Sequence, residues 1–394
     1  MTGTRFIVAA NLIDGSGAHV RRNVFLAVDG GMISAIGPAT DLSGHDRAAS
    51  DDLSHCIILP ALVDCSTSLS QSPSVDPGVR ASSAEADPAE KAAMLERHIH
   101  DCHTHGVLGV ADSGESTYLP EGYQESILTI RSSGLLCRSR LCATGYLESK
   151  DFLRIAYSAN VGKVDEELSP HLSHQDLHHI LQHRSGKKAV VVANGPQQVK
   201  EALAAGCDAI EQGYGMGEDN LRTMAEKDVL WIPGVLRAKN GLDGAGSGGE
   251  VCCRFSLRYV APGKPIPGAE AFWKKRLGEQ LSQLRLAREL GVKTAVGTGA
   301  GSIGILHGES MVEEMKLFIK AGYSLAETIH CASENGASFF GMKNLGALTV
   351  GRPASFLVAR GTMQQLPRKL AYLEGIYVDG APSITYHKNP AKTA

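Results

Sequence analysis

Residues 57–69 have the sequence Ile-Ile-Leu-Pro-Ala-Leu-Val-Asp-Cys-Ser-Thr-Ser-Leu, and this stretch decides the fold of the chain. It is an apolar run with a proline near its start and small polar residues at its end. Such a run is typical of a strand that is buried on both faces, as in a parallel sheet. The polar residues that follow the apolar part predict a site at the carboxyl end of this strand.

The length and charge of the chain limit what it can be. Its 394 residues suit an α/β barrel of about 250 residues and a smaller second module. Lys and Arg number 39 against 42 acidic residues, the net charge is -3, and no long run of like charge occurs. This balance predicts no nucleic acid and no membrane as partner. We expect a small-molecule substrate or ligand, and homo-oligomerisation stays open.

Cysteine usage and the N-terminus indicate the compartment. The nine cysteines are scattered, except for the pair Cys252-Cys253, and no CxxC spacing is repeated. This pattern favours a reducing environment over a disulfide framework. No long apolar segment follows the start of the chain, and no stretch of about 18 apolar residues occurs anywhere. We therefore expect a cytoplasmic protein.

Short strands are predicted at both ends of the chain. Alternating apolar and polar residues, with Asp-Gly turn signals between them, predict antiparallel strands over 5–13 and 23–37. The same kind of short strand is predicted over 345–354, 356–358 and 375–380. Both ends therefore belong to sheet structure of a different kind from the middle of the chain.

The middle of the chain alternates strand and helix patterns, which indicates a parallel sheet with crossover helices. Together with the first strand, eight strands are predicted, the other seven over 107–112, 139–144, 152–156, 189–193, 209–211, 229–232 and 294–297. Helices are predicted over 89–105, 197–205, 220–227, 272–289, 311–321 and 326–340. Residues 239–270 are rich in Gly and Pro and too long for an ordinary connection, so we expect a lid loop there.

The stretch at 57–69 closely resembles the first barrel strand of the amidohydrolase superfamily, where Asp-x-His-x-His places two histidines on a catalytic metal. The turn at 346–354, Gly-x-Leu-x-x-Gly-x-Pro-Ala, resembles that of the imidazolonepropionase-like and prolidase-like subgroup. The resemblance implies a TIM-like (β/α)8 barrel over 57–344. It also implies a small flanking β-sandwich built from residues 1–56 and 345–394.

The same resemblance assigns each metal position to a residue of this chain. Two serines stand where the first-strand histidines are expected, and Arg154 stands in place of the lysine that is carboxylated in the family. A valine and a glutamine replace two further histidines, and a glycine replaces the aspartate. The six positions are Ser66, Ser68, Arg154, Val192, Gln212 and Gly299. None supplies imidazole, thiolate or carboxylate, so the resemblance implies a divergent member that lacks the metal ligands. We expect no metal and no cofactor.

Four residues are candidates for acid/base catalysis. Asp64 and Glu211 match family positions, and either becomes a general base if burial raises its pKa. Asp112 ends a predicted strand in a Val-Ala-Asp-Ser-Gly sequence that resembles a family pattern. His307, in the loop after the last strand, is the remaining candidate for a proton shuttle near neutral pH. For each of these residues a purely structural hydrogen-bonding role is the alternative.

Arg154 is the main candidate for substrate binding. Its permanent charge suits a carboxylate, an enolate or a phenolate. The alternative is a salt bridge to Glu211 or Asp64 that replaces the metal electrostatically, and the two roles are compatible. Further candidates near strand ends are Ser66, Ser68, Asn194, Gln212, Tyr214, Tyr146 and Thr298.

Two histidine clusters imitate metal sites. Residues 101–105 match Asp-x-His-x-His, but they end a helical run and precede Gly106, so we expect a polar helix end away from the site. His98 and His100 lie close by in sequence. Residues 174–183 contain histidine pairs four apart, and we expect a solvated outer helix face.

Three functions stay open at this point. The first is a metal-independent enzyme that acts on a small organic molecule by acid/base chemistry, as a lyase, isomerase or cyclase. The second is a non-catalytic pseudoenzyme that binds a small molecule or serves as a scaffold. The third is a C–N bond hydrolase, either metal-free or with a displaced metal site. The fold alone does not separate them, because function lies in the site.

Overall fold

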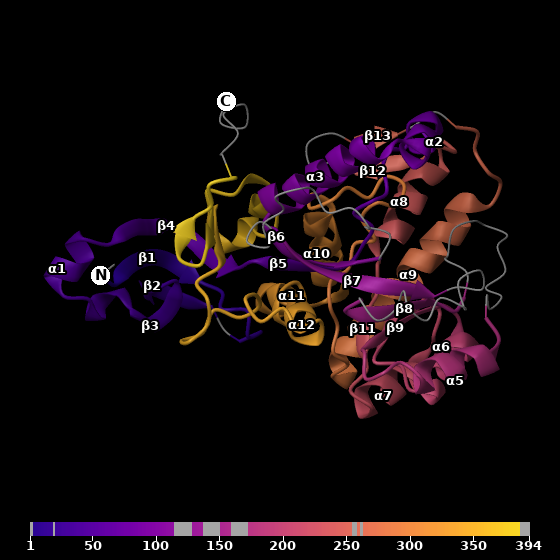
Figure 1. Ribbon diagram of the computed structural model, residues 1–394, viewed down its shortest axis with the longest axis horizontal. Helices are drawn as coiled ribbons and strands as arrows, with labels where there is room; N and C mark the ends of the chain where they lie inside the picture. Colours follow the sequence, from indigo (N-terminus) through magenta and orange to yellow (C-terminus); the bar gives the residue numbers. More distant parts are fainter. Residues whose placement is uncertain are drawn as a thin grey trace.

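A computed structural model describes residues 3–18, 20–113, 128–136, 150–158, 172–253, 258–260 and 263–386. Two seven-stranded sheets and one two-stranded hairpin lie within these ranges. Figure 1 shows the N-terminal strands of residues 5–38 and 51–60 as an extended lobe beside a larger body of helices and strands. Among the described residues, no helix combines the length and apolar character needed to cross a bilayer.

The first large sheet is parallel, with strand order β11-β10-β9-β8-β7-β6-β5. Its strands are β5 (Leu62–Thr67), β6 (Val107–Asp112), β7 (Thr129–Leu136), β8 (Phe152–Ala156), β9 (Ala189–Ala193), β10 (Ala209–Gln212) and β11 (Leu230–Ile232). Every residue of β5, β6 and β9 is buried. Strands of a parallel sheet are covered on both faces, which explains their nearly continuous apolar sequences.

The segment 293–300 closes this sheet into a barrel. On one side, the backbone N–H of Trp231 in β11 donates to the Lys293 carbonyl at 2.9 Å. On the other side, the N–H of Cys65 in β5 donates to the Val296 carbonyl at 2.9 Å. The ring of strands is thereby completed, and the fold-class prediction of a TIM-like barrel with a flanking sheet from both chain ends is confirmed.

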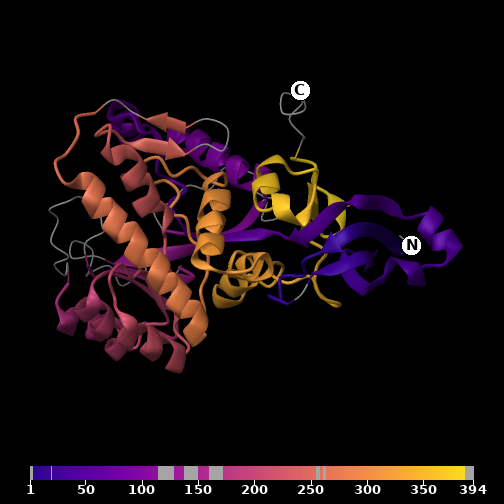
Figure 2. The same ribbon diagram turned by 180° about the vertical axis from the view of Figure 1, so that it is seen from behind.

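Helices surround the barrel, as both views show (Figures 1 and 2). Most of them follow a barrel strand, as a crossover connection requires. They are α2 (Pro77–Glu85), α3 (Pro88–Thr104), α5 (His174–Gln182), α6 (Pro196–Ala205), α7 (Glu218–Glu226), α8 (Leu236–Ala245), α9 (Ala269–Leu290), α10 (Ser310–Ala321), α11 (Leu325–Cys331) and α12 (Glu334–Phe339). Helix α3 starts with a capping box between Asp87 and Glu90, and Pro88 occupies its first position.

The second large sheet combines both ends of the chain, in the order β16-β15-β14-β4-β1-β2-β3. Its strands are β1 (Arg5–Leu12), β2 (Arg21–Asp29), β3 (Met32–Pro38), β4 (Asp51–Pro60), β14 (Phe356–Arg360), β15 (Gly375–Val378) and β16 (Ala381–Pro382). All neighbours are antiparallel except β1 and β4. Ile7, Leu26, Ile58 and Phe356 form part of its own buried cluster.

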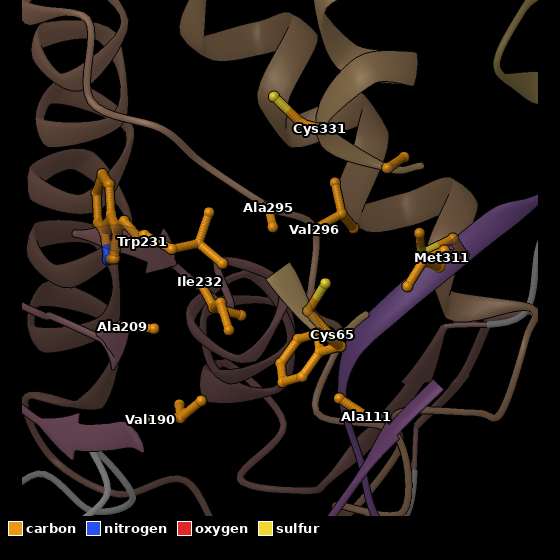
Figure 3. Packing of buried hydrophobic residues seen from close by; sticks show 14 of the residues in the cluster. Cys65, Ala111, Val190, Ala209, Trp231, Ile232, Ala295, Val296, Met311 and Cys331 are labelled. Carbon is orange, nitrogen blue, oxygen red and sulfur yellow. The ribbon is translucent and has the colours of Figure 1, made fainter. Parts of the chain in front are cut away.

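The main core fills the space between the barrel and its helices. Cys65 of β5, Val296 of the closing segment, Met311 of α10 and Cys331 of α11 belong to one buried cluster, which Figure 3 shows from close by. Burial in this cluster raises the pKa of the Cys65 thiol well above its ordinary value. Cys65 is therefore an inert packing residue rather than a nucleophile.

Several predicted elements have different bounds in the structure. The stretch 57–69 is divided: Ile57–Pro60 ends β4 in the second sheet, and only Leu62–Thr67 forms the first barrel strand. The third barrel strand is β7, whereas the predicted strand at 139–144 lies outside the described residues. The helix predicted over 326–340 is interrupted between α11 and α12.

The predicted lid loop at 239–270 contains regular structure. Helix α8 continues to Ala245, and the strands β12 (Val251–Cys253) and β13 (Arg258–Val260) form an antiparallel hairpin before α9 begins. The many glycines predict a loop, but Gly241 and Gly244 lie inside α8. Gly241 packs against Trp273 of α9 so closely that a Cβ would lie 2.4 Å from the indole ring.

Candidate functional site

The alternation of side chains along β5 directs two polar residues into the barrel. Val63 and Cys65 face α12, where a Cβ on Gly336 would lie 2.4 Å from the Cys65 sulfur. Successive side chains of a strand point to opposite faces, so Asp64 and Ser66 face the barrel interior. The polar end of the stretch at 57–69 therefore contributes to the barrel mouth, as the sequence predicts.

Arg154 and Glu211 form an ion pair at the barrel mouth. Arg154 on β8 donates from Nε and Nη2 to the two carboxylate oxygens of Glu211 on β10, both at 2.7 Å. Ser66 donates from Oγ to Glu211 Oε1 at 2.7 Å. Burial opposes the ionisation of Glu211, but Arg154 and Ser66 outweigh it and lower the pKa of this carboxyl. Glu211 is therefore a carboxylate at neutral pH.

Asp64 lies behind this ion pair and bonds to the closing segment. Its Oδ1 accepts the N–H groups of Ser66 at 3.1 Å and of Thr298 at 2.9 Å, and its Oδ2 accepts the Thr298 hydroxyl. Only 2% of Asp64 is exposed, and this burial raises its pKa to about 6 despite the three hydrogen bonds. Asp64 therefore titrates close to neutral pH and reaches the barrel mouth through the Thr298 hydroxyl.

Asp112 has a structural position. Its Oδ1 accepts the N–H of Leu69 at 2.8 Å, and only 1% of the residue is exposed. The adjacent Ser113 shares a 2.8 Å hydrogen bond with Ser68. These contacts fix the chain that leaves β5 to the end of β6.

His307 is buried and stacks on His98. The centroids of the two rings lie 3.9 Å apart, and the ring planes are inclined by 18°. His307 Nε2 donates to the Ser68 carbonyl at 3.0 Å, and its Nδ1 has no hydrogen-bond partner among the described residues. Burial and the neighbouring His98 lower the pKa of His307 to about 3. This ring is therefore neutral at neutral pH, which suits a structural role better than a proton shuttle.

His98 of α3 lies just before residues 101–105, the helix end that the sequence predicts to lie away from the site. Its Nδ1 donates to the Leu69 carbonyl at 2.7 Å, so it holds the segment that follows β5. The histidine spacing on a helix gave no signal of this contact, because it joins residues 29 positions apart. The exposed residues His174 and His179 on α5 match the expected outer face.

Asn194, Gln212 and Tyr214 form a second polar group at the strand ends. Asn194 donates from Nδ2 to Gln212 Oε1 at 2.7 Å and accepts the Tyr214 N–H at 2.8 Å. The Tyr214 hydroxyl donates to the Gly234 carbonyl at 2.7 Å, and only 1% of this residue is exposed. Of the three, only Gln212 lines the barrel mouth. Tyr146 lies outside the described residues.

Two connected hollows lie at the barrel mouth. The inner hollow has about 70 Å³ and is lined among others by Ser66, Arg154, Glu211 and Thr298. We call it the recess. A larger cavity of about 580 Å³ lies beside it, against α2 and α3, and Arg237 lines both. The recess holds only a small chemical group, because the ion pair takes up the space, whereas the cavity has the size of a small-molecule site.

Glu314 of α10 fixes the start of α8, which carries Arg237. The fully buried Glu314 carboxyl accepts the N–H groups of Val235 at 2.8 Å and Leu236 at 2.7 Å. These two donors have no partner within the helix, so the carboxyl satisfies groups that burial would otherwise leave unpaired. Neither Glu314 nor Arg237 could be singled out from the sequence, because their roles depend on the packing of α10 against α8.

The described residues at the barrel mouth do not form a ligand set for a divalent metal. A metal needs several imidazole, thiolate or carboxylate ligands around one point. Within the described residues, no three His, Cys, Asp or Glu side chains are grouped in this way. Glu211 binds the Arg154 guanidinium and the Ser66 hydroxyl instead of a metal. Gly299 has no side chain to offer as a ligand, and the space beside it is open, because a Cβ there would meet only the Ser302 hydroxyl, at 3.9 Å.

Comparison with known proteins decides the family. A model of the amidohydrolase family matches residues 57–388. The chain belongs to this family. No curated protein matches the sequence of this chain.

Solved structures share the amidohydrolase fold at low sequence identity. A Xaa-Pro dipeptidase with bound methionine in its active site has a TM-score of 0.78 and 19% identity, and the match covers 97% of this chain and 100% of that one. The ochratoxinase of A. niger has a TM-score of 0.74 and 14% identity, with 96% and 95% covered. Molinate hydrolase has a TM-score of 0.72 and 15% identity, with 97% of this chain and 95% of that one covered. At such identities the likeness concerns the fold.

Proposed function

We propose that this chain is a metal-independent enzyme of the amidohydrolase family that acts on a small organic molecule by acid/base chemistry. The observation that carries the proposal is the ion pair between Arg154 and Glu211, which lines the recess at the barrel mouth. Active sites of such barrels lie at this end. A permanent cation on a protein side chain here takes over the electrostatic role of a metal ion.

Arg154 supplies the positive charge of the proposed reaction. Its guanidinium is oriented by two hydrogen bonds to Glu211, and 21% of the side chain is exposed. A cation that is fixed before the substrate arrives stabilises negative charge that develops on the substrate. Unlike a metal ion, a guanidinium does not generate hydroxide from bound water at neutral pH. This favours isomerisation, elimination or cyclisation over attack on an unactivated amide.

Asp64 and Thr298 form the proposed path for the proton. Thr298 lines the recess, accepts the Ala300 N–H at 3.0 Å and donates its own hydroxyl proton to Asp64. A proton taken from the substrate by the Thr298 oxygen is matched by transfer of the hydroxyl proton to Asp64. The substrate keeps the electron pair as an anion beside Arg154, and the proton later returns to the product or to a leaving group. A carboxyl with a pKa of about 6 suits both directions of transfer.

Two other functions have specific support. The small volume of the recess, about 70 Å³, favours a non-catalytic protein that only binds its ligand. The Ser66 hydroxyl, which donates to Glu211 at 2.7 Å, is compatible with hydrolysis of an activated C–N bond. Structures with this fold include proteins named as a dipeptidase and a hydrolase, which makes hydrolysis the first alternative reaction to test.

Metal content is the first test of the proposal. The purified protein, prepared without chelator, is analysed for metals, and its thermal midpoint is measured with and without added zinc, manganese or iron. We expect no stoichiometric metal and no upward shift of the midpoint, because the described residues at the barrel mouth offer no ligand set. About one equivalent of tightly held metal, or stabilisation by one of these ions, would refute metal independence.

Catalysis itself is tested with a mixture of small metabolites. The wild type and Arg154→Met are incubated with a cell extract freed of protein, and the compounds are followed by mass spectrometry. Consumption of a compound by the wild type alone supports the enzyme. A compound that the wild type retains without converting it supports the binding protein instead. Arg222→Met is the matched control, because this arginine is 55% exposed and lies on α7, away from the recess.

A further inference from the structure

The larger cavity has a lining that points to its ligand. It has about 580 Å³ and lies between the end of β5, the helices α2 and α3, and the loop around Ser302. Small-molecule sites commonly have about 300–1,000 Å³ and combine apolar walls with a few charged or polar groups. The cavity therefore has room for a whole small molecule, in contrast to the recess beside it.

Three cations line this cavity, namely Arg80 of α2, Lys91 of α3 and Arg237 of α8. No Asp or Glu is among the described residues that line it. Arg80 donates to the Ser74 carbonyl, which fixes its guanidinium. In the part of the chain that the structure describes, neither Arg80 nor Lys91 has a carboxylate partner. Cations gathered without anions attract a negatively charged ligand.

One wall of the cavity is apolar. Met94 and Leu95 of α3 are buried with 8% and 3% exposed, and they line the cavity together with Ile303. An inorganic ion makes no use of such a wall. A molecule with an apolar body and an anionic group satisfies both parts of the lining.

We infer that this cavity binds a small organic anion, with a carboxylate or phosphate group on the cations and an apolar body against α3. Arg237 and Ser302 line both the cavity and the recess, so a ligand held there extends its far end towards Arg154. The inference rests on the proposed function for the claim that this ligand is the substrate. The binding itself is independent of whether the barrel mouth is catalytic.

Binding of matched probes tests the inference. The probes are 3-phenylpropionate, phenyl phosphate, inorganic phosphate and the neutral 3-phenylpropionamide, titrated calorimetrically against the full chain. We expect at least one organic anion to bind, with the neutral amide and inorganic phosphate at least about tenfold weaker. The better of the two organic anions identifies the anionic group.

Single-charge variants locate the probe. Lys91→Met and Arg80→Met are each expected to weaken binding of the organic anion about fivefold or more. Lys275→Met on α9 loses the same charge from a side chain that is 74% exposed and outside the cavity, and it is expected to leave binding unchanged. The melting midpoint of each variant shows that it is folded.

Three results would overturn the inference. They are no binding of either organic anion up to about 10 mM, equal binding of 3-phenylpropionate and its amide, and equal weakening by Lys275→Met and Lys91→Met. Arg154→Met separates this inference from the proposed function. If Arg154→Met keeps the anion affinity, the cavity is a binding site in its own right, even if the metal or activity tests reject the metal-independent enzyme.

Discussion

Replacing Arg154 by Met should destabilise the protein strongly, because it leaves Glu211 buried without its cation. The Glu211 side chain is 6% exposed and accepts two hydrogen bonds from Arg154. Removing one partner of a buried ion pair costs about 3–5 kcal/mol. The entropy of unfolding is about 2.1 cal/mol/K per residue. For 394 residues, the free energy of unfolding therefore changes by about 0.8 kcal/mol per kelvin near the midpoint. The melting midpoint should therefore fall by about 4–6 °C.

The loss should depend on pH in a defined direction. In the wild type the folded pKa of Glu211 lies below its ordinary value of 4.5, so its contribution to stability is fully present above pH 4.5 and disappears as the pH falls through the folded pKa. In Arg154→Met, burial remains and raises that pKa above 4.5. The variant then loses stability as the pH rises above 4.5. The difference in unfolding free energy between the wild type and the variant therefore increases between pH 4.5 and 7.5.

Calorimetry of the wild type, Arg154→Met, Glu211→Gln and the double variant at pH 5 and 7.5 checks this reasoning. Glu211→Gln added to Arg154→Met should recover part of the lost stability, since a neutral amide costs less to bury than an unpaired carboxylate. Arg222→Met is the control, because its pair with Glu218 is about half exposed and contributes about 1 kcal/mol or less. A midpoint shift below about 1 °C for Arg154→Met, equal at both pH values, would show that no buried ion pair exists.

Asp64→Asn should flatten the pH dependence of stability. The folded pKa of Asp64 is about 6, against an ordinary value of 3.8, so the wild type is about 3 kcal/mol less stable above pH 6 than below pH 4. Denaturant midpoints across this pH range measure the difference. An unchanged slope in this variant would show that Asp64 has an ordinary pKa. Glu314→Ala should cost about 2–4 kcal/mol in urea unfolding, because two N–H groups at the start of α8 lose their acceptor. Gly301→Ala should cost about 2 kcal/mol more than Gly322→Ala, since both have positive φ but only the first Cβ would meet the Ser68 carbonyl oxygen, at 2.4 Å. Equal losses in this last pair would show that the close approach is absent.

Much of the barrel could be predicted from local sequence. Strands β8 and β9 and the helices α3 and α10 have the predicted bounds within one residue, because buried apolar runs and capping residues act over short distances. The inward orientation of Asp64 and Ser66 also follows from the stretch at 57–69, because side chains alternate between the two faces of a strand. What the sequence did not predict was the division of this stretch between two sheets, since pairing with β14 joins residues about 300 positions apart.

The sequence by itself indicated the family through the resemblance of residues 57–69 and 346–354 to amidohydrolase motifs, and the barrel through its alternating strand and helix patterns. Only the tertiary structure decided the roles of the residues at the mouth. It joined Arg154 to Glu211, buried His307 against His98, and placed Arg237 on both the recess and the cavity. The physical reason is that pKa, charge pairing and cavity shape depend on groups distant in sequence, and only packing brings these groups together.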